Sequence, residues 1–513
     1  MRPHSAKSSS NPAPRAPLCS SVRTTAPARG PAGRTRIETY LFFFVSFALV
    51  VCLTHAGYFS LPYYWDELGQ FVPAALDIYQ RGAWVAERTI PNVHPPGLMA
   101  WLAGVWTIFG YSTEVTRAAM LLLASIAVFI VFLLAIELAK GARGAPAFAA
   151  VLFLLASPLF YTQAMLAELD MPAMLLSSWA LLLFLQDRRR AAALVCVAAV
   201  LVKETTIVVP AVFALWLLKD RRWRDAAWFV LPPAALAGWI VFLWRATGNP
   251  FGNSEFAQYN ITFALHPVRI AIALARRVFY LGVENFHWLG WIFVFLAWRR
   301  GVFRTRAWKI AGTVALAHVL VVTVLGGAVL ERYLLPALAI MYVAFAEAMP
   351  RVAQVALAAG LAAGLFWNPP YPFPYENNLA MVDFVRLQKT AAQYVEKRYP
   401  GRTVTTAWPL TEALWLPELG YVGRRVHIQR VQDFTPGPVG ALDPKSVDVF
   451  VLFSRDWVRA GDPRSSRLLR GLVRRAYHWQ PPVDDGYIES RFGLERVAYW
   501  ESRGQWAAVF VRR

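Results

Sequence analysis

The sequence predicts a polytopic α-helical membrane protein with about 11 transmembrane helices and a small α/β domain at its C-terminal end. Three observations lead to this fold class. The 513 residues are 57% hydrophobic and only 16% charged. Many windows reach the roughly 17–25 apolar residues that span a bilayer. Residues 378–513 contain no apolar run of that length, and their pattern indicates strands and amphipathic helices.

The N-terminal segment, residues 1–36, is rich in Ser, Pro, Ala and Arg and has seven basic residues and no acidic one. This composition predicts a disordered cytoplasmic tail. A cleaved signal peptide would have its apolar run near the start, so it is not expected. The first span is predicted at about 38–57, with its N-terminal end inside because of the basic tail. Residues 58–114 then form a first outer loop.

The apolar stretch from His94 to Gly110 decides the topology of the rest of the predicted membrane domain, 37–367. If it crosses the membrane, the basic turns at 140–143 and 187–190 lie outside. If it lies along the outer surface as an interfacial helix, every basic turn lies inside. The second choice is favoured and gives eleven spans. After the first, they are expected at about 115–139, 145–163, 171–186, 190–202, 205–218, 226–245, 278–298, 309–328, 333–349 and 352–367.

Residues 368–377 form a proline-rich linker to the C-terminal domain, which the odd number of spans places outside. Within this domain a helix is expected over 379–398. Strands are expected over residues 402–407, 447–452 and 507–511.

Composition also excludes several classes of protein. The net charge of +20 could indicate nucleic-acid binding, but basic residues cluster in short turns between apolar runs, which indicates membrane topology instead. Cys52 and Cys196 lie in spans and Cys19 in the tail, so neither a disulfide framework nor a zinc site is suggested. The absence of a Walker loop, a Gly-x-Gly-x-x-Gly motif and a His-Glu-x-x-His motif argues against a phosphate-driven pump or a zinc protease.

The first candidate site is the pair Asp66-Glu67 in the first outer loop. A carboxylate there can act as general base toward an acceptor hydroxyl or amine. It can equally be an acidic first turn of a helix. Glu168 and Asp170 lie between two spans on the same outer side, and Asp170 either caps the helix that Pro172 begins or faces the same cavity as Asp66.

Basic candidates lie on the same side. His94, before Pro95-Pro96-Gly97, either binds a phosphate or caps a helix. Lys203, next to Glu204 between two short spans, needs an anionic partner at that depth, and short helices there usually line a cavity. Arg332 and Arg117 either bind a lipid phosphate or extend toward lipid headgroups.

In their order and placement these motifs resemble those of the C-type glycosyltransferase superfamily. The most similar members are protein O-mannosyltransferases, aminoarabinose transferases of lipid A and bacterial lipopolysaccharide-core transferases. Gly97 departs from the family's Leu at that position, and His94 departs from the Lys of the aminoarabinose group. The matching segments are Trp65-Asp66-Glu67, His94-Pro95-Pro96-Gly97, Arg117, Glu168-Leu169-Asp170-Met171-Pro172, Lys203 and Arg332-Tyr333-Leu334-Leu335-Pro336.

The resemblance implies the C-type fold and an inverting transfer of a sugar from a polyprenyl-phosphate carrier to a lipid, glycan or protein acceptor. It implies no required metal, and no cofactor is expected. Asp66 would be the base or would orient the acceptor, and Glu67 and Asp170 would shape the catalytic site. The implied location is the bacterial inner membrane, with the site facing the periplasm. The substrate-binding residues would be His94, Arg117, Glu168, Lys203, Arg332 and Tyr333.

Two other classes of function stay open. A secondary transporter also has broken helices with charges at mid-depth, but no paired repeat is found here. A noncatalytic scaffold that presents residues 378–513 would not explain the many charges at the ends of the spans.

Overall fold

The computed structural model describes residues 32–139, 146–325, 328–367, 375–455, 471 and 474–512. The chain forms two compact units, Met1–Phe43 and Phe44–Arg513, and the second contains the sheet and most of the long helices. Helix α1 (Ala32–Thr54) begins six residues before the first predicted span. Most of the predicted tail and residues 368–374 of the predicted linker lie outside the described residues, so both remain predictions.

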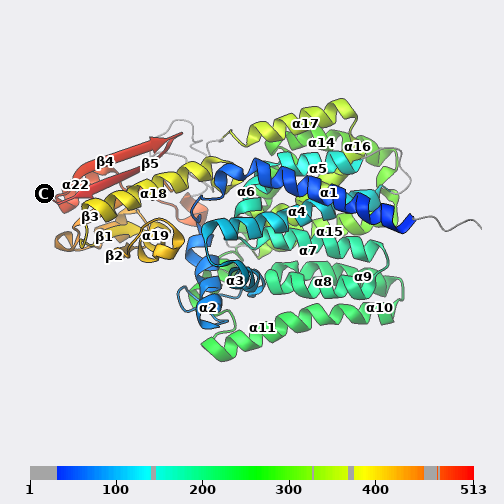
Figure 1. Ribbon diagram of the computed structural model, residues 1–513, viewed down its shortest axis with the longest axis horizontal. Helices are drawn as coiled ribbons and strands as arrows, with labels where there is room; N and C mark the ends of the chain where they lie inside the picture. Colours follow the sequence, from blue (N-terminus) through cyan, green and yellow to red (C-terminus); the bar gives the residue numbers. More distant parts are fainter. Residues whose placement is uncertain are drawn as a thin grey trace, which may run out of the picture. The chain divides into compact units, whose positions relative to one another are not determined.

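The second unit is a bundle of apolar helices that carries a small sheet domain at one end (Figure 1). Polar backbone groups in lipid must be satisfied within a segment, which is why apolar runs of this kind fold as helices. The helices of the bundle are α4 (Thr113–Leu138), α5 (Pro146–Ala156), α6 (Pro158–Met165), α7 (Asp170–Leu185), α8 (Arg189–Val202), α9 (Val208–Lys219), α10 (Trp223–Ala227), α11 (Leu231–Thr247), α13 (Pro267–Gly282), α14 (His287–Arg299), α15 (Arg306–Val324), α16 (Leu335–Ala348) and α17 (Arg351–Gly364).

Length and composition identify fewer spans than the sequence predicts. Among the described residues, four helices are long and apolar enough to cross a membrane, or six if two bent pairs each form one span. Helices α7 and α17 are apolar but shorter. The predicted count of eleven therefore stays a prediction.

Two predicted spans are not the single straight helices that were expected. The segment predicted at 145–163 is bent by 69° between α5 and α6, where Pro158 begins a new helix. The segment predicted at 278–298 starts earlier, at Pro267, and is bent by 51°. Its break contains Asn285 and Phe286, whose φ angles of 53° and 64° cannot continue a right-handed helix.

The stretch whose placement decided the predicted topology forms α3 (Gly97–Phe109), a helix of 13 residues. At 1.5 Å per residue it is about 20 Å long, which is too short to cross a bilayer core of about 30 Å. It packs against α2 (Val72–Arg81), and both lie at the end of the bundle that carries the sheet domain (Figure 1). This placement supports an interfacial helix.

The C-terminal domain contains a five-stranded sheet of order β2-β1-β3-β5-β4. Strand β1 pairs in parallel with β2 and β3, and β5 pairs antiparallel with β3 and β4. The three predicted strands and the predicted helix are present, whereas β2 and the largely exposed edge strand β4 were not predicted. The elements are α18 (Ala380–Arg398), β1 (Val404–Ala407), α19 (Leu410–Trp415), β2 (Ile428–Val431), α20 (Pro436–Gly440), β3 (Val449–Phe453), α22 (Asp485–Phe492), β4 (Glu495–Ser502) and β5 (Gln505–Val511).

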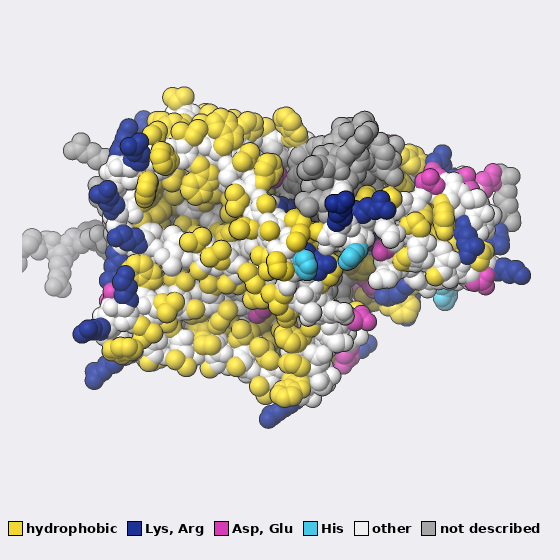
Figure 2. Space-filling model, turned by 180° about the vertical axis from the view of Figure 1, so that it is seen from behind, with side chains coloured by type: hydrophobic (Ala, Val, Ile, Leu, Met, Phe, Trp, Pro, Cys, Tyr) yellow, Lys and Arg dark blue, Asp and Glu magenta, His cyan; other side chains and the backbone are white. Residues whose placement is uncertain are grey.

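Basic side chains gather at the end of the bundle opposite the sheet domain, with an apolar surface between the two ends (Figure 2). Exposed arginines in the turns before α8, before α10 and after α14 lie at this end. The distribution is the one that the positive-inside rule predicts for a cytoplasmic face.

The orientation of α3 can be tested with single cysteines in a chain from which the native cysteines have been removed. Glu114, four residues after Gly110, is exposed, and Arg224 is exposed at the basic end. We expect Glu114→Cys in intact cells to react with an impermeant thiol reagent, because the interfacial helix keeps this residue outside. Arg224→Cys should react only after permeabilisation. The reverse pattern would mean that α3 crosses the membrane.

Candidate active site

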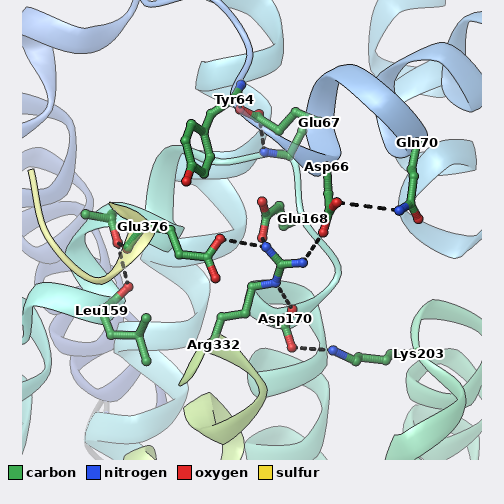
Figure 3. Close-up of polar contacts among 12 residues, drawn as sticks. Tyr64, Asp66, Glu67, Gln70, Leu159, Glu168, Asp170, Lys203, Arg332 and Glu376 are labelled. Atoms are coloured by element: carbon green, nitrogen blue, oxygen red, sulfur yellow. Dashed lines mark hydrogen bonds and ion pairs between the residues drawn. The ribbon is translucent and has the colours of Figure 1, made fainter. Parts of the chain in front are cut away.

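A buried arginine lies at the centre of the candidate site (Figure 3). The Arg332 side chain is 3% exposed and forms ion pairs with four carboxylates. Its Nη1 lies 2.6 Å from Glu168 Oε2 and 2.7 Å from Glu376 Oε2. Its Nε lies 3.2 Å from Asp170 Oδ2, and its Nη2 pairs with Asp66 Oδ2. A planar guanidinium with five donors suits such multiple contacts.

The four carboxylates come from three segments that are far apart in the sequence. Asp66 precedes a short π-helix, η2 (Glu67–Phe71), in the first outer loop. Glu168 lies in the turn after α6, and Asp170 is the first residue of α7. Glu376 lies in a 3-10 turn, η9 (Tyr375–Asn377), before the C-terminal domain. The predicted outer carboxylates and Arg332 therefore meet at one place in the fold.

Lys203 adds a second cation to this cluster. It lies in extended backbone between α8 and the 3-10 turn η3 (Glu204–Ile207). Its Nζ is 2.5 Å from Asp170 Oδ1 and 3.9 Å from the centre of the Tyr333 ring. A buried ammonium needs such partners, because its desolvation is costly.

In the contacts described here, four carboxylates face two cations. Burial shifts the pKa of two of the carboxylates. Burial raises the pKa of Glu168 well above its usual range, although Arg332 opposes the shift. Burial also raises the pKa of Glu376 to about 7. Desolvation disfavours the charged form of a carboxyl group, so both groups hold a proton more readily than an exposed glutamate does.

Glu67 and Arg117 form a separate pair rather than part of the Arg332 cluster. Both side chains are at most 1% exposed, and Arg117 Nη1 lies 2.5 Å from Glu67 Oε1. The Glu67 carboxylate also accepts hydrogen bonds from the backbone amides of Tyr64 (2.8 Å) and Ala167 (2.6 Å). With its oxygens occupied and enclosed, this pair fits a role in holding the loop. The predicted roles of Glu67 in shaping the catalytic site and of Arg117 in binding phosphate stay predictions.

Asp66 differs from its neighbour in being accessible. Its side chain is 14% exposed, and Gln70 Nε2 lies 3.5 Å from its Oδ1. The residue before it, Trp65, has a φ of 43°, a left-handed conformation that costs a bulky residue about 1–3 kcal/mol. Strain of this kind persists only where the surroundings enforce it, so the loop that presents Asp66 is tightly held.

His94 lies beside this cluster. Its Nδ1 is 3.0 Å from Glu204 Oε2. The two segments approach closely because Gly97 has no side chain: a Cβ there would lie 2.5 Å from the carbonyl oxygen of Leu201. This contact accounts for the glycine where the family has leucine.

A pocket lies beside Gln70 and His94. His94 lines it together with Gln70, Asn92 and Trp239, between the first outer loop and α11. Gln70 both lines this pocket and contacts Asp66.

Glu376 was not predicted as a site residue. In the sequence it stands at the end of the proline-rich stretch, where it reads as part of a linker. The next residue, Asn377, donates a hydrogen bond of 3.0 Å to Glu331, which also pairs with Arg276. The structural role of Glu376 is indicated only by its place in a polar turn that is buried against Arg332 and Glu331. Burial cannot be read from a single sequence.

Across the described parts of the chain, no group of three or more His, Cys, Asp or Glu is arranged to hold a metal ion.

Comparisons with known proteins give a partial family match and a similar fold. Residues 93–247 match the family model described as dolichyl-phosphate-mannose-protein mannosyltransferase. The fold is similar to the crystal structure of ArnT from Cupriavidus metallidurans bound to undecaprenyl phosphate, with a TM-score of 0.56 and 16% identity over 92% of this chain and 98% of that chain. The apo structure of ArnT matches over the same shares at 16% identity, with a TM-score of 0.53. No curated protein sequence matches the chain.

The family match covers His94, Arg117, Glu168, Asp170 and Lys203. The similarity of fold extends over 92% of the chain. The chain thus has a partial match to a dolichyl-phosphate-mannose-protein mannosyltransferase family model and a fold similar to that of ArnT, in line with the resemblance that its motifs predicted.

Proposed function

We propose that the chain is an inverting glycosyltransferase that moves a sugar from a polyprenyl-phosphate donor to a lipid, glycan or protein acceptor. The reaction would take place on the outer face of the inner membrane. The observation that carries the proposal is the accessibility of Asp66. Its side chain is 14% exposed, against 0% for Glu168, 4% for Asp170 and 1% for Glu376. A general base must reach the proton that it removes, and Asp66 is the carboxylate of this cluster that substrate can reach.

In this reaction the acceptor hydroxyl or amine gives its proton to Asp66, and its O or N atom forms a bond to the anomeric carbon of the donor sugar. The bond between that carbon and the phosphate oxygen breaks, and the electron pair leaves with the polyprenyl phosphate. Arg332 holds the Asp66 carboxylate by an ion pair, and Gln70 contacts its other oxygen. Attack opposite the leaving phosphate inverts the anomeric configuration.

The leaving phosphate gains negative charge as the bond breaks, and cations nearby stabilise that charge. His94 is the accessible basic group beside the cluster, with a side chain 16% exposed and lining the pocket next to Gln70. All three cations are paired with carboxylates, but Lys203 (6% exposed) and Arg332 (3% exposed) are more deeply buried than His94, so they act as a positive background rather than as free ligands. Tyr333 lies under the Lys203 ammonium.

Two comparisons support a transferase over the secondary transporter. The family model is described as a mannosyltransferase. The structure with the same fold is described as bound to undecaprenyl phosphate, a carrier of the class proposed here.

Replacing the proposed base tests the function directly. In proteoliposomes supplied with polyprenyl-phosphate sugar and acceptor, Asp66→Asn should lower kcat by about 10²–10⁴-fold, the usual contribution of a general base. The amide keeps a partner for Arg332, so the melting temperature should change little. Glu87→Gln is a matched control, because Glu87 is a 55%-exposed carboxylate of the same loop. Full transfer by Asp66→Asn would exclude Asp66 as the base.

The raised pKa of Glu376 predicts a dependence of stability on pH. Burial raises this pKa from 4.5 to about 7, so the folded state binds the proton more tightly than the unfolded state. The resulting stabilisation is fully present below the unfolded pKa and is lost as the pH rises through the folded pKa. We therefore expect Glu376→Gln to show a smaller fall in melting temperature between about pH 5 and about pH 8 than the unmodified protein. An equal fall in both proteins would contradict the assignment.

A further inference from the structure

The C-terminal domain makes direct contacts with the loop that carries Asp66. The Trp65 ring centre lies 4.7 Å from that of Trp408 and 5.9 Å from that of Phe384, both in the C-terminal domain. Phe384 also meets Tyr64, at 5.7 Å. The buried hydroxyl of Tyr421 donates a hydrogen bond of 2.6 Å to the carbonyl of Tyr63. Three successive loop residues before Asp66 are therefore held from the C-terminal domain.

Trp408 also contacts the loop on the far side of Asp66. It follows strand β1, at the carboxyl end of the parallel part of the sheet, and its indole lies against Gly69. A Cβ at Gly69 would lie 2.8 Å from Trp408 Cε2 and would also clash with Nε1. The missing side chain of Gly69 thus makes room for the indole, which contacts the loop one residue before and three residues after Asp66.

These contacts supply the constraint that the strained backbone requires. Trp65 keeps a φ of 43° although a bulky residue avoids this region. Its indole is enclosed by Trp408 and Phe384, with the Arg455 guanidinium carbon 5.8 Å from its ring centre. Without these contacts around the Trp65 indole, the backbone before Asp66 is free to relax to an ordinary conformation and to turn the carboxylate away from Arg332.

We propose that Trp408 is a positioning residue for Asp66, so that the C-terminal domain is part of the catalytic machinery and not only a platform beside it. The inference rests on the proposed function, because it assigns Trp408 to the geometry of the same base. A displacement of about 1 Å at a reacting group can lower a rate by about 100-fold. A domain that served only to bind acceptor would instead affect the acceptor KM.

The first experiment compares two tryptophans of the C-terminal domain. Trp408→Ala should lower kcat by about 10- to 100-fold with both KM values unchanged, and Trp408→Phe should restore most of the rate. Trp500→Ala is the control, because Trp500 is likewise half-buried but packs against Tyr394 within the domain. Equal kcat in Trp408→Ala and Trp500→Ala, or a change confined to the acceptor KM, would overturn the proposal.

The second experiment uses the contact at Gly69. Gly69→Ala should lower kcat in the unmodified chain, because the new methyl group strikes the indole, and should cause little further loss in the Trp408→Ala background. Gly104→Ala is the control, since a Cβ there meets no atom within 4 Å. If the losses in kcat caused by Gly69→Ala and Trp408→Ala simply multiply in the double variant, the two residues do not act together. That result would overturn the proposal.

A readout that needs no activity separates this inference from the proposed function. Amide hydrogen exchange over residues 64–71 should be faster in Trp408→Ala than in Trp500→Ala. If the unmodified protein transfers no sugar but this difference is present, the proposed function fails and the positioning role is supported. If the protein is active and neither exchange nor kcat responds to Trp408→Ala, the positioning role fails and the proposed function stands.

Discussion

The buried guanidinium of Arg332 is the constraint on which the site depends. It joins the first outer loop, the turn between α6 and α7, the start of α7 and the turn before the C-terminal domain. A charge with 3% exposure needs this number of partners, because removing one side of a buried pair typically costs about 3–5 kcal/mol. The arrangement therefore makes the position of Asp66 a consequence of how the end of the bundle next to the sheet domain packs.

Two adjacent carboxylates have opposite surroundings as a result. Glu67 is closed off with Arg117 and two backbone amides, whereas Asp66 keeps an accessible oxygen beside Gln70 and the pocket. The Glu67–Arg117 pair fixes where the loop leaves the bundle. Asp66 can then face substrate while the loop keeps its conformation. The free-energy cost of burying a charge thus falls on Glu67, and the accessible Asp66 carboxylate is left for the chemistry.

The C-terminal domain completes this arrangement from the other side. Trp408 contacts Trp65 and Gly69, and Glu376 reaches Arg332 from the turn that leads into the domain. The Trp408 contacts join segments more than 300 residues apart, and the Glu376–Arg332 pair joins residues 44 apart. The site is therefore built jointly by the helical bundle and the sheet domain, which gives a physical reason for the two to occur in one chain.

The amino-acid sequence by itself determined the helical membrane class, the basic end, three strands of the sheet and a set of outer polar motifs, because apolar runs, charge placement and β-branched segments are local patterns. Only the tertiary structure decided that Glu67 and Arg117 are sealed together while Asp66 stays accessible. It also decided the breaks at Pro158 and Asn285, and the roles of Glu376 and Trp408. Those features depend on burial and on contacts between distant segments, which no local pattern records.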